Sequence, residues 1–285
     1  MVVLDGRPLI DVHLHPARRA SLKLDWATWM QGFDVFDGLY DEAGDIRPAV
    51  FDAYLASEGV DAAVALAEYS PRVTGWQTAE DMAALTAANP RRVYFAANVN
   101  PHVHYPVADE LSRQLALGAV ALKIHPVHAG FPADDQSMYP AYEICQSAGI
   151  PLIVHFGTST FPGALNRFAD PALLDRVLSD FRTLNVVLAH GGRGWWYDAA
   201  AFLALADPRV WIELSGLPPS RLQAYYAKHN WARLTRRMIF ATDWPGIPGI
   251  AENARAVAAL CPDEETASLV LAGNAMEVYH LKPAL

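Results

Sequence analysis

Six side chains that can bind a metal ion or transfer a proton stand at the ends of apolar, strand-like runs. They are His13, His15, His125, His155, His190 and Asp243. His13 and His15 form a His-x-His pair, and because side chains alternate along a strand, both imidazoles point to the same face. These two imidazoles, a third from His155 and the carboxylate of Asp243 suit a divalent transition metal such as Zn²⁺, with one coordination position left for water.

The runs that end in these residues alternate with amphipathic segments of helix length. Eight runs are apolar and rich in β-branched residues: Pro8–His13, Val60–Ala67, Arg92–Val99, Ala119–His125, Pro151–Phe156, Asn185–His190, Arg209–Leu214 and Arg237–Thr242. From the second run onward they begin every 24 to 34 residues, which is the length of one βα unit. Helices are predicted at Ala79–Ala88, Val107–Leu117, Tyr139–Ala148, Pro171–Phe181 and Ile250–Leu260.

Eight βα units predict an α/β fold, a closed (β/α)8 (TIM) barrel, with residues 1–285 as a single domain. A doubly wound open sheet is the alternative, but no Gly-rich dinucleotide-binding turn follows the first run. Because all strands of such a barrel end at one mouth, the barrel would bring the six side chains together.

The connection after the first strand carries an insertion of about 20 residues compared with a minimal βα unit. It contains five aromatic residues, Trp26, Trp29, Phe33, Phe36 and Tyr40. The insertion is expected either to cover the mouth of the barrel as a lid or to pack into a hydrophobic cluster of its own.

Composition excludes several classes of protein. The 285 residues carry a net charge of −9 and no long Lys/Arg run, so binding to nucleic acid is not expected. Cys145 and Cys261, the two cysteines, form neither a disulfide framework nor a CxxC metal site, and we expect free thiols in a reducing compartment. Without a signal-peptide pattern or a long apolar run, we expect a soluble, cytoplasmic protein that makes no membrane contact.

The strand-end motifs resemble those of the amidohydrolase superfamily. In order along the chain they are Asp11-Val12-His13-Leu14-His15-Pro16, Leu122-Lys123-Ile124-His125-Pro126, Ile153-Val154-His155-Phe156-Gly157, Leu188-Ala189-His190-Gly191-Gly192 and Thr242-Asp243-Trp244-Pro245. The chain is most similar to the amidohydrolase-2 branch, which contains hydrolases and decarboxylases related to aminocarboxymuconate-semialdehyde decarboxylase. Gly273-Asn274-Ala275 also resembles the closing motif of that branch.

The resemblance implies a metal-dependent enzyme. His13, His15, His155 and Asp243 would hold one divalent metal ion, zinc by preference, with Mn²⁺, Fe²⁺ or Co²⁺ as alternatives. His190 would transfer a proton beside the bound water or substrate oxygen, and Asp243 would also accept and return a proton. Relatives are often dimers, so a homodimer is an open expectation.

Three residues are predicted to bind the substrate. Lys123 and His125 lie two positions apart and face inward, and Arg193 follows the sixth strand at the same mouth. We expect Lys123 to pair with a substrate carboxylate or to be a charge buried near Asp243, and Arg193 to bind an anionic group through its bidentate fork. In the binuclear branch of the superfamily a lysine at this place is carbamylated and bridges two metal ions, which is the alternative for Lys123.

Two reactions fit these residues equally well. The first is hydrolysis of a C–O or C–N bond, in a lactone or amide of a small organic acid, by a metal-activated water. The second is non-oxidative decarboxylation of an aromatic or unsaturated acid at the same metal site. A catalytically inactive barrel is the third possibility.

No GxSxG motif is present, so the sequence gives no support for a nucleophilic serine. The second His-x-His pair, His102 and His104, follows Pro101 beyond a strand and is expected to be structural.

Overall fold

Eight parallel strands form one sheet that curls into a nearly closed barrel. In order around the sheet they are β1 (Ile10–Leu14), β2 (Ala62–Leu66), β5 (Val93–Asn98), β6 (Leu122–Ile124), β7 (Leu152–Gly157), β8 (Val186–Arg193), β9 (Val210–Glu213) and β10 (Met238–Ile239). The gap between β10 and β1 is closed by a parallel bridge from Leu14 to Trp244 and by the Asp243 N–H, which donates to the His13 carbonyl at 3.1 Å. This computed structural model describes residues 6–31, 38–247 and 249–283.

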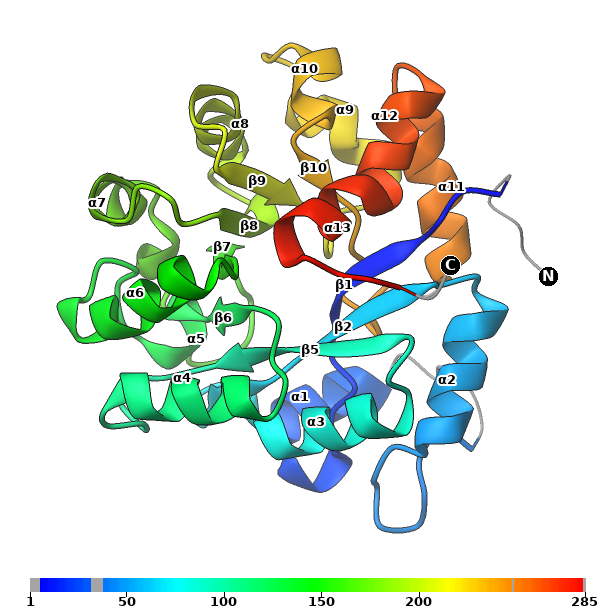
Figure 1. Ribbon diagram of the computed structural model, residues 1–285, viewed down its shortest axis with the longest axis vertical. Helices are drawn as coiled ribbons and strands as arrows, with labels where there is room; N and C mark the ends of the chain where they lie inside the picture. Colours follow the sequence, from blue (N-terminus) through cyan, green and yellow to red (C-terminus); the bar gives the residue numbers. More distant parts are fainter. Residues whose placement is uncertain (1–5, 32–37, 248, 284–285) are drawn as a thin grey trace.

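Helices surround the strands (Figure 1). The longer ones are α1 (Leu24–Gln31), α2 (Pro48–Ser57), α3 (Ala79–Ala88), α4 (Val107–Ala116), α6 (Tyr139–Ala148), α7 (Ala172–Asp180), α8 (Tyr197–Ala206) and α11 (Ile250–Leu260). Shorter turns are α5 (Pro126–Ala129), α9 (Leu222–Tyr225), α10 (Trp231–Thr235), α12 (Glu264–Ser268) and α13 (Asn274–Tyr279), with 3-10 turns η1 (Arg19–Ser21), η2 (Gln136–Met138), η3 (Asn166–Ala169) and η4 (Pro219–Arg221) and the π-turn η5 (Leu269–Gly273). Among these described segments no helix is long and apolar enough to cross a membrane.

The predicted TIM barrel is confirmed. Each of the eight apolar runs overlaps one strand of the sheet, although β1, β7 and β8 extend one to three residues beyond their runs, and α3, α6 and α11 have the predicted bounds. Helix α6 ends at Gly149, whose positive φ of 68° suits a residue without a Cβ atom. A hairpin of β3 (Glu68–Ser70) and β4 (Gly75–Gln77) was not predicted, and it places Glu68 directly beyond the end of β2.

The barrel has an inner and an outer apolar core. The outer core lies between strands and helices and contains Phe51, Phe95 and Leu188. The inner core contains residues such as Val12, Ala121 and Trp211, and α13 packs against it through three buried residues, Ala275, Val278 and Tyr279. Figure 1 shows α13 lying across the barrel. The hydroxyl of Tyr94, near the start of β5, donates to the Lys282 carbonyl, so the C-terminal segment covers the end where the strands begin.

Candidate metal centre and active-site cavity

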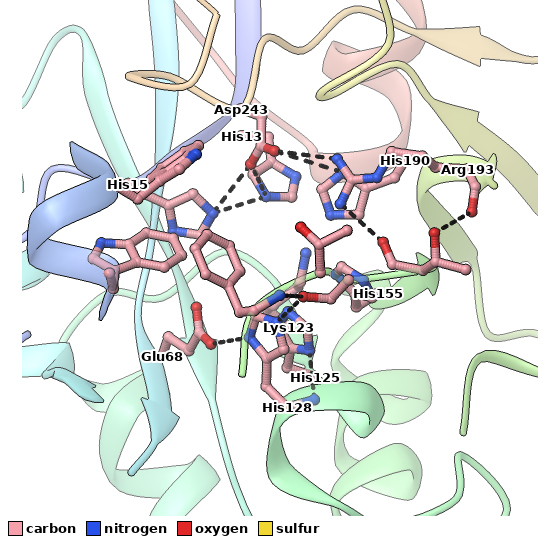
Figure 2. A pocket seen from close by; sticks show the side chains of 16 residues that line it. His13, His15, Glu68, Lys123, His125, His128, His155, His190, Arg193 and Asp243 are labelled. Atoms are coloured by element: carbon pink, nitrogen blue, oxygen red, sulfur yellow. Dashed lines mark hydrogen bonds and ion pairs between the residues drawn. The ribbon is translucent and has the colours of Figure 1, made fainter. Parts of the chain in front are cut away.

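The carboxyl ends of the strands surround a cavity of about 320 Å³ (Figure 2). All eight residues predicted to act at the site line it: His13, His15, Lys123, His125, His155, His190, Arg193 and Asp243. The remaining lining residues are Trp26, Trp29, Glu68, His128, Thr158, Ser159, Thr160 and Phe161. Residues separated by up to 230 positions therefore share one enclosure, while their individual roles stay predictions.

Three of the predicted metal ligands form a tight triangle. His13 Nε2 lies 3.2 Å from His15 Nε2, and each of these nitrogens lies 3.4 Å from Asp243 Oδ1. The two imidazoles are buried. The His-x-His pair therefore directs both rings toward one point, as the alternation of side chains along a strand predicts.

A β-bulge in β1 sets the direction of His13. Asp11 pairs with Ala63 and Leu14 with Ala65, so two residues, Val12 and His13, face a single residue of β2. A bulge of this kind changes which way a side chain points. Val12 belongs to the inner core, and His13 turns into the cavity.

Glu213, at the end of β9, holds the other side of the His13 ring. Its Oε2 lies 2.6 Å from His13 Nδ1, and both side chains are 1% exposed. Because a carboxylate only accepts hydrogen bonds, this contact assigns the proton to Nδ1 and leaves a lone pair on Nε2. Burial, followed by the charge of Lys123, lowers the pKa of His13, which favours the same neutral ring.

The backbone at Asp243 adopts a conformation that residues with a Cβ atom rarely take. Its φ is 70°. Asp11 supports it from β1, because Asp11 Oδ2 accepts from the Thr242 hydroxyl at 2.6 Å. Burial alone would raise the pKa of Asp243, but the hydrogen bond to His15 and the nearby charge of Arg193 hold it well below its usual range. The carboxylate is therefore ionised and able to bind a cation or accept a proton.

His190 also lies on distorted backbone. His155 pairs with Ala189 and Gly157 with Arg193, so one residue of β7 faces three of β8, and His190, Gly191 and Gly192 all have positive φ. His190 Nδ1 lies 2.8 Å from the Ser215 hydroxyl, 3.1 Å from the Ser215 carbonyl, which only accepts, and 3.9 Å from Asp243 Oδ2. Burial and then Arg193 lower the pKa of His190 well below its ordinary value. The ring is neutral, with its proton on Nδ1 and a lone pair on Nε2.

His155 lines the cavity but lies outside the triangle. Its Nε2 is 3.0 Å from the Gly157 carbonyl, and its ring centroid lies 3.9 Å from that of His125 and 4.4 Å from that of His190. Within the described parts of the chain its Nδ1 is buried without a hydrogen-bond partner. The predicted fourth ligand thus has a free nitrogen, although the closest donor set consists of the other three residues.

A second cluster beside the triangle was not predicted as a unit. Glu68, His125 and His128 bring three potential metal-binding atoms within 4.8 Å of one another. Their hydrogen-bonding groups are used by one another and by Ser159, since His128 Nδ1 contacts Glu68 at 3.0 Å and Nε2 contacts Ser159 Oγ at 2.8 Å. His125 Nδ1 accepts from the His128 backbone N–H, so the neutral His125 ring carries its proton on Nε2.

Two cations face the cavity. The Nζ of Lys123 is buried and makes no hydrogen bond with any described residue, and burial lowers the pKa of Lys123 to about 8. Arg193 lies closer to solvent, with its Nη1 atom 3.7 Å from Asp243 Oδ2 and its Nη2 atom donating to the Thr158 carbonyl at 3.3 Å. Both are placed where an anionic substrate group could reach them.

The first βα connection contributes an aromatic wall. Trp26 packs on His15 with a centroid separation of 5.6 Å and on Phe161 at 5.1 Å, and Trp29 contacts Trp26 at 5.3 Å. Of the five predicted aromatic residues, Phe33 and Phe36 lie outside the described residues, and Tyr40 packs under Arg19 away from the cavity. The start of the insertion therefore covers the site.

The two histidines of the other His-x-His pair, His102 and His104, are used elsewhere. His104 packs edge-on against Tyr69 and its Nδ1 accepts from the Asn100 backbone, while His102 is exposed. Neither lines the cavity.

Sequence reasoning missed Glu68, Ser159 and Glu213. The signal for Glu213 was available, since it is the last residue but one of the seventh strand-like run, as Asp243 directly follows the eighth.

The triangle fits a divalent metal ion. Donors bound at about 2.0–2.1 Å to a tetrahedral ion lie about 3.3–3.4 Å apart, which matches the observed separations of 3.2 and 3.4 Å. Two imidazoles and an ionised carboxylate form the donor set that Zn²⁺ and its first-row neighbours prefer. Glu213 would be the carboxylate that orients His13 toward such an ion.

Comparisons with known proteins agree with this fold. The family model Amidohydro_2, described as Amidohydrolase, matches residues 10–281. Among curated proteins, a dihydroorotase of Leptothrix cholodnii is 36% identical over 109 residues. That match covers 35% of this chain and only 30% of the dihydroorotase.

Solved structures show the same barrel. An uncharacterised TIM-barrel protein of Bordetella bronchiseptica superposes with a TM-score of 0.74 at 22% identity, covering 96% of this chain and 98% of that one. A probable 2-pyrone-4,6-dicarboxylic acid hydrolase of Acinetobacter baumannii with bound citric acid gives 0.65 at 16% identity (96% and 99%). A 5-carboxyvanillate decarboxylase of Novosphingobium aromaticivorans, complexed with manganese and a nitrobenzoic acid, gives 0.65 at 15% identity (98% and 97%).

Proposed function

Because this chain belongs to the amidohydrolase family, we propose that it is a metal-dependent hydrolase that cleaves a C–O or C–N bond, in a lactone or amide, of a small acidic substrate. The observation that carries this proposal is the triangle of His13 Nε2, His15 Nε2 and Asp243 Oδ1, with separations of 3.2 to 3.4 Å. Three donors at this spacing hold a cation at the mouth of the barrel, where enzymes of this fold carry out their chemistry.

His13, His15 and Asp243 would hold one divalent ion, and His155 would complete the set through its unpartnered Nδ1. Zinc is the ion that we propose, with manganese, iron and cobalt as alternatives because the same donors bind them. Such an ion lowers the pKa of a bound water to about 7 and polarises a substrate oxygen.

Asp243 and His190 would handle the proton. Asp243 is ionised, and its Oδ2 faces His190 and Arg193, so this oxygen can accept the proton of the attacking water and return it to the leaving oxygen or nitrogen. His190 is neutral with Nδ1 donating to Ser215, so its Nε2 can accept a hydrogen bond from water or substrate. The rare backbone conformation of both residues fixes these directions.

The acidic part of the substrate would bind to Lys123, His125 and Arg193. Lys123 offers a buried cation that no described residue pairs, and His125 offers its Nε2 proton. A cavity of about 320 Å³ suits a small molecule. The Acinetobacter baumannii structure carries citric acid, which is also a small organic acid.

Non-oxidative decarboxylation of an aromatic acid is the second candidate. The wall of Trp26, Trp29 and Phe161 favours it, because an aromatic ring could pack against these side chains beside the metal ligands. The similar Novosphingobium aromaticivorans protein is a decarboxylase of a substituted benzoic acid. In this reaction Asp243 or His190 would protonate the carbon that loses CO₂.

Product analysis in ¹⁸O-labelled water separates the two reactions. Lactones, amides and aromatic acids are incubated with metal-saturated protein, with Asp243→Asn as the inactive control. One ¹⁸O atom in the product without CO₂ release supports hydrolysis, and CO₂ release without ¹⁸O supports decarboxylation. Turnover that Asp243→Asn retains in full would contradict both candidates.

A further inference from the structure

A serine, a histidine and a glutamate are joined by hydrogen bonds in the cavity. None of them belongs to the triangle of His13, His15 and Asp243. Ser159 Oγ lies 2.8 Å from His128 Nε2, and His128 Nδ1 lies 3.0 Å from Glu68 Oε1. All three residues are buried and all three line the cavity. They come from the segment after β7, from α5 and from β3, so the unpredicted hairpin completes the set.

The Glu68 carboxylate fixes the direction of the hydrogen bonds between these three residues. Burial alone would raise the pKa of Glu68, but the hydrogen bonds from His128 and from the Thr74 hydroxyl bring it down to about 2, so the carboxylate is ionised and only accepts. The contact with Glu68 therefore places the His128 proton on Nδ1, and Nε2, which faces Ser159 Oγ, is left to accept a hydrogen bond. Ser159 Oγ then donates its proton to His128 Nε2, which is the relation of a nucleophile to its general base.

Neighbouring groups hold all three members in place. The Thr74 hydroxyl donates to Glu68 Oε1 at 2.7 Å, and the His128 backbone N–H donates to His125 Nδ1. Asn166 binds the Ser159 backbone on both sides, accepting from its N–H at 2.8 Å and donating to its carbonyl at 3.1 Å. The serine hydroxyl is thus presented to His128 on an ordered segment, as an activated nucleophile requires.

We propose that Ser159 is a nucleophile activated by His128 and oriented by Glu68, which gives this cavity a metal-independent acyl-transfer activity on small carboxylic esters. Ser159 Oγ forms a bond to the carbonyl carbon as its proton moves to His128 Nε2. The ester C–O bond breaks, and the departing alcohol takes that proton. Water then gives a proton to His128, bonds to the acyl carbon and releases the acid, while the proton returns to Ser159 Oγ. The Nε2–H of His125 and the ammonium of Lys123, in the same lining, are the donors available to the carbonyl oxygen.

Sulfonylation tests this proposal directly. The purified protein, with its native metal content, is treated with phenylmethanesulfonyl fluoride, which transfers its sulfonyl group to an activated serine and loses fluoride. Intact mass and peptide mapping then identify the modified residue. We expect one adduct, on Ser159, with a rate at least about 100-fold lower in His128→Gln because the general base is lost. Thr160→Ala, which removes a neighbouring hydroxyl from the same lining, should label at the wild-type rate.

Labelling elsewhere, no labelling, or an unchanged rate in His128→Gln would overturn the proposal. Mapping on the wild-type chain identifies the modified atom directly, so the result stands even if Ser159→Ala is unstable. Metal content measured on the same samples separates this proposal from the metal-dependent one. If the wild-type protein binds metal but Ser159 is not labelled, only the serine site is refuted. If Ser159 is labelled but the wild-type protein takes up no metal, only the metal centre is refuted.

Discussion

His13 Nδ1 and Glu213 Oε2 lie 2.6 Å apart, although 200 residues separate them in the chain. The carboxylate holds the imidazole in the tautomer that presents the Nε2 lone pair to His15 and Asp243. Glu213 Oε1 also accepts from the Ser215 backbone N–H at 2.7 Å, so the same side chain connects the triangle of His13, His15 and Asp243 to the segment that positions His190.

Glu213→Gln should weaken metal binding without unfolding the barrel. The amide cannot provide the negative charge that makes His13 a strong ligand, and loss of such a partner lowers metal affinity by about 10- to 100-fold. Competition with a chromogenic chelator measures the change in Kd. Glu265→Gln, on the exposed surface beside Arg236, is the matched control. Equal affinities in the two variants would show that Glu213 does not orient a metal ligand.

Lys123 should make the stability of the protein depend on pH. The pKa of this side chain is lowered by burial to about 8, whereas the unfolded chain keeps its ordinary value of 10.5. Between these values the unfolded chain binds the proton and the folded chain does not, so the free energy of unfolding rises as the pH increases from 8 to 10.5. Below pH 8 Lys123 is protonated in both states, so the full free-energy cost of burying its charge remains. The difference in pKa corresponds to about 3 kcal/mol.

Lys123→Met should remove this increase in the free energy of unfolding with pH. Urea unfolding at pH 7.5 and at pH 10 measures the increase. Lys282→Met, at an exposed position, should keep the wild-type increase. Comparing the two variants cancels the titration of the other groups. An increase of the same size in Lys123→Met and Lys282→Met would mean that the Lys123 ammonium is solvated or paired in the folded protein.

Arg193→Ala should raise KM for acidic substrates by about 10- to 100-fold, the value of a lost charge-assisted hydrogen bond. Because Arg193 also lies 3.7 Å from Asp243, kcat should be measured on a neutral analogue of the same substrate. The expected result is a KM effect confined to the acid, with partial recovery in Arg193→Lys, which keeps the charge but loses the fork. Unchanged KM for every acidic substrate would remove Arg193 from the binding site.

Gly216→Ala should damage the site more than the fold. Gly216 has a φ of 65°, and a Cβ atom there would collide with Arg193 Nη1 and would come within 3.0 Å of Asp243 Oδ2. Gly149→Ala is the matched control, because its φ is 68° and its Cβ would meet only the distant His280 ring. Both variants should lose about 1–2 kcal/mol of folding free energy through the positive φ. Only Gly216→Ala should lower kcat/KM, by at least about tenfold, and equal activity in the two variants would contradict the proposed role of this contact.

The sequence was sufficient to predict the barrel and the convergence of its strand ends. Runs such as Pro151–Phe156 are apolar on both faces, which is typical of parallel strands buried between a core and helices. Once eight such runs are counted, His155, His190 and Asp243 must meet at one mouth, whatever their separation along the chain. The alternation of side chains also explains why His13 and His15 share a direction.

The supporting contacts could not be predicted, because they depend on local backbone distortions. The bulge at Val12 and His13 and the positive φ of His190 have no signature that a single sequence reveals. Glu68 belongs to a short hairpin, and its pairing with His128 spans 60 positions. The sequence also argued against a nucleophilic serine because it lacks a GxSxG turn, but Ser159 reaches its histidine through a loop of different shape.

Metal content measured on variant proteins tests the central claim most directly. After saturation with zinc and removal of excess ion, elemental analysis should find about one equivalent per chain in the wild type and in His102→Ala, whose side chain lies in the other His-x-His pair. His13→Ala, His15→Ala and Asp243→Ala should each retain well under half an equivalent, while circular dichroism shows an intact barrel. Full zinc content in these three variants would contradict the account.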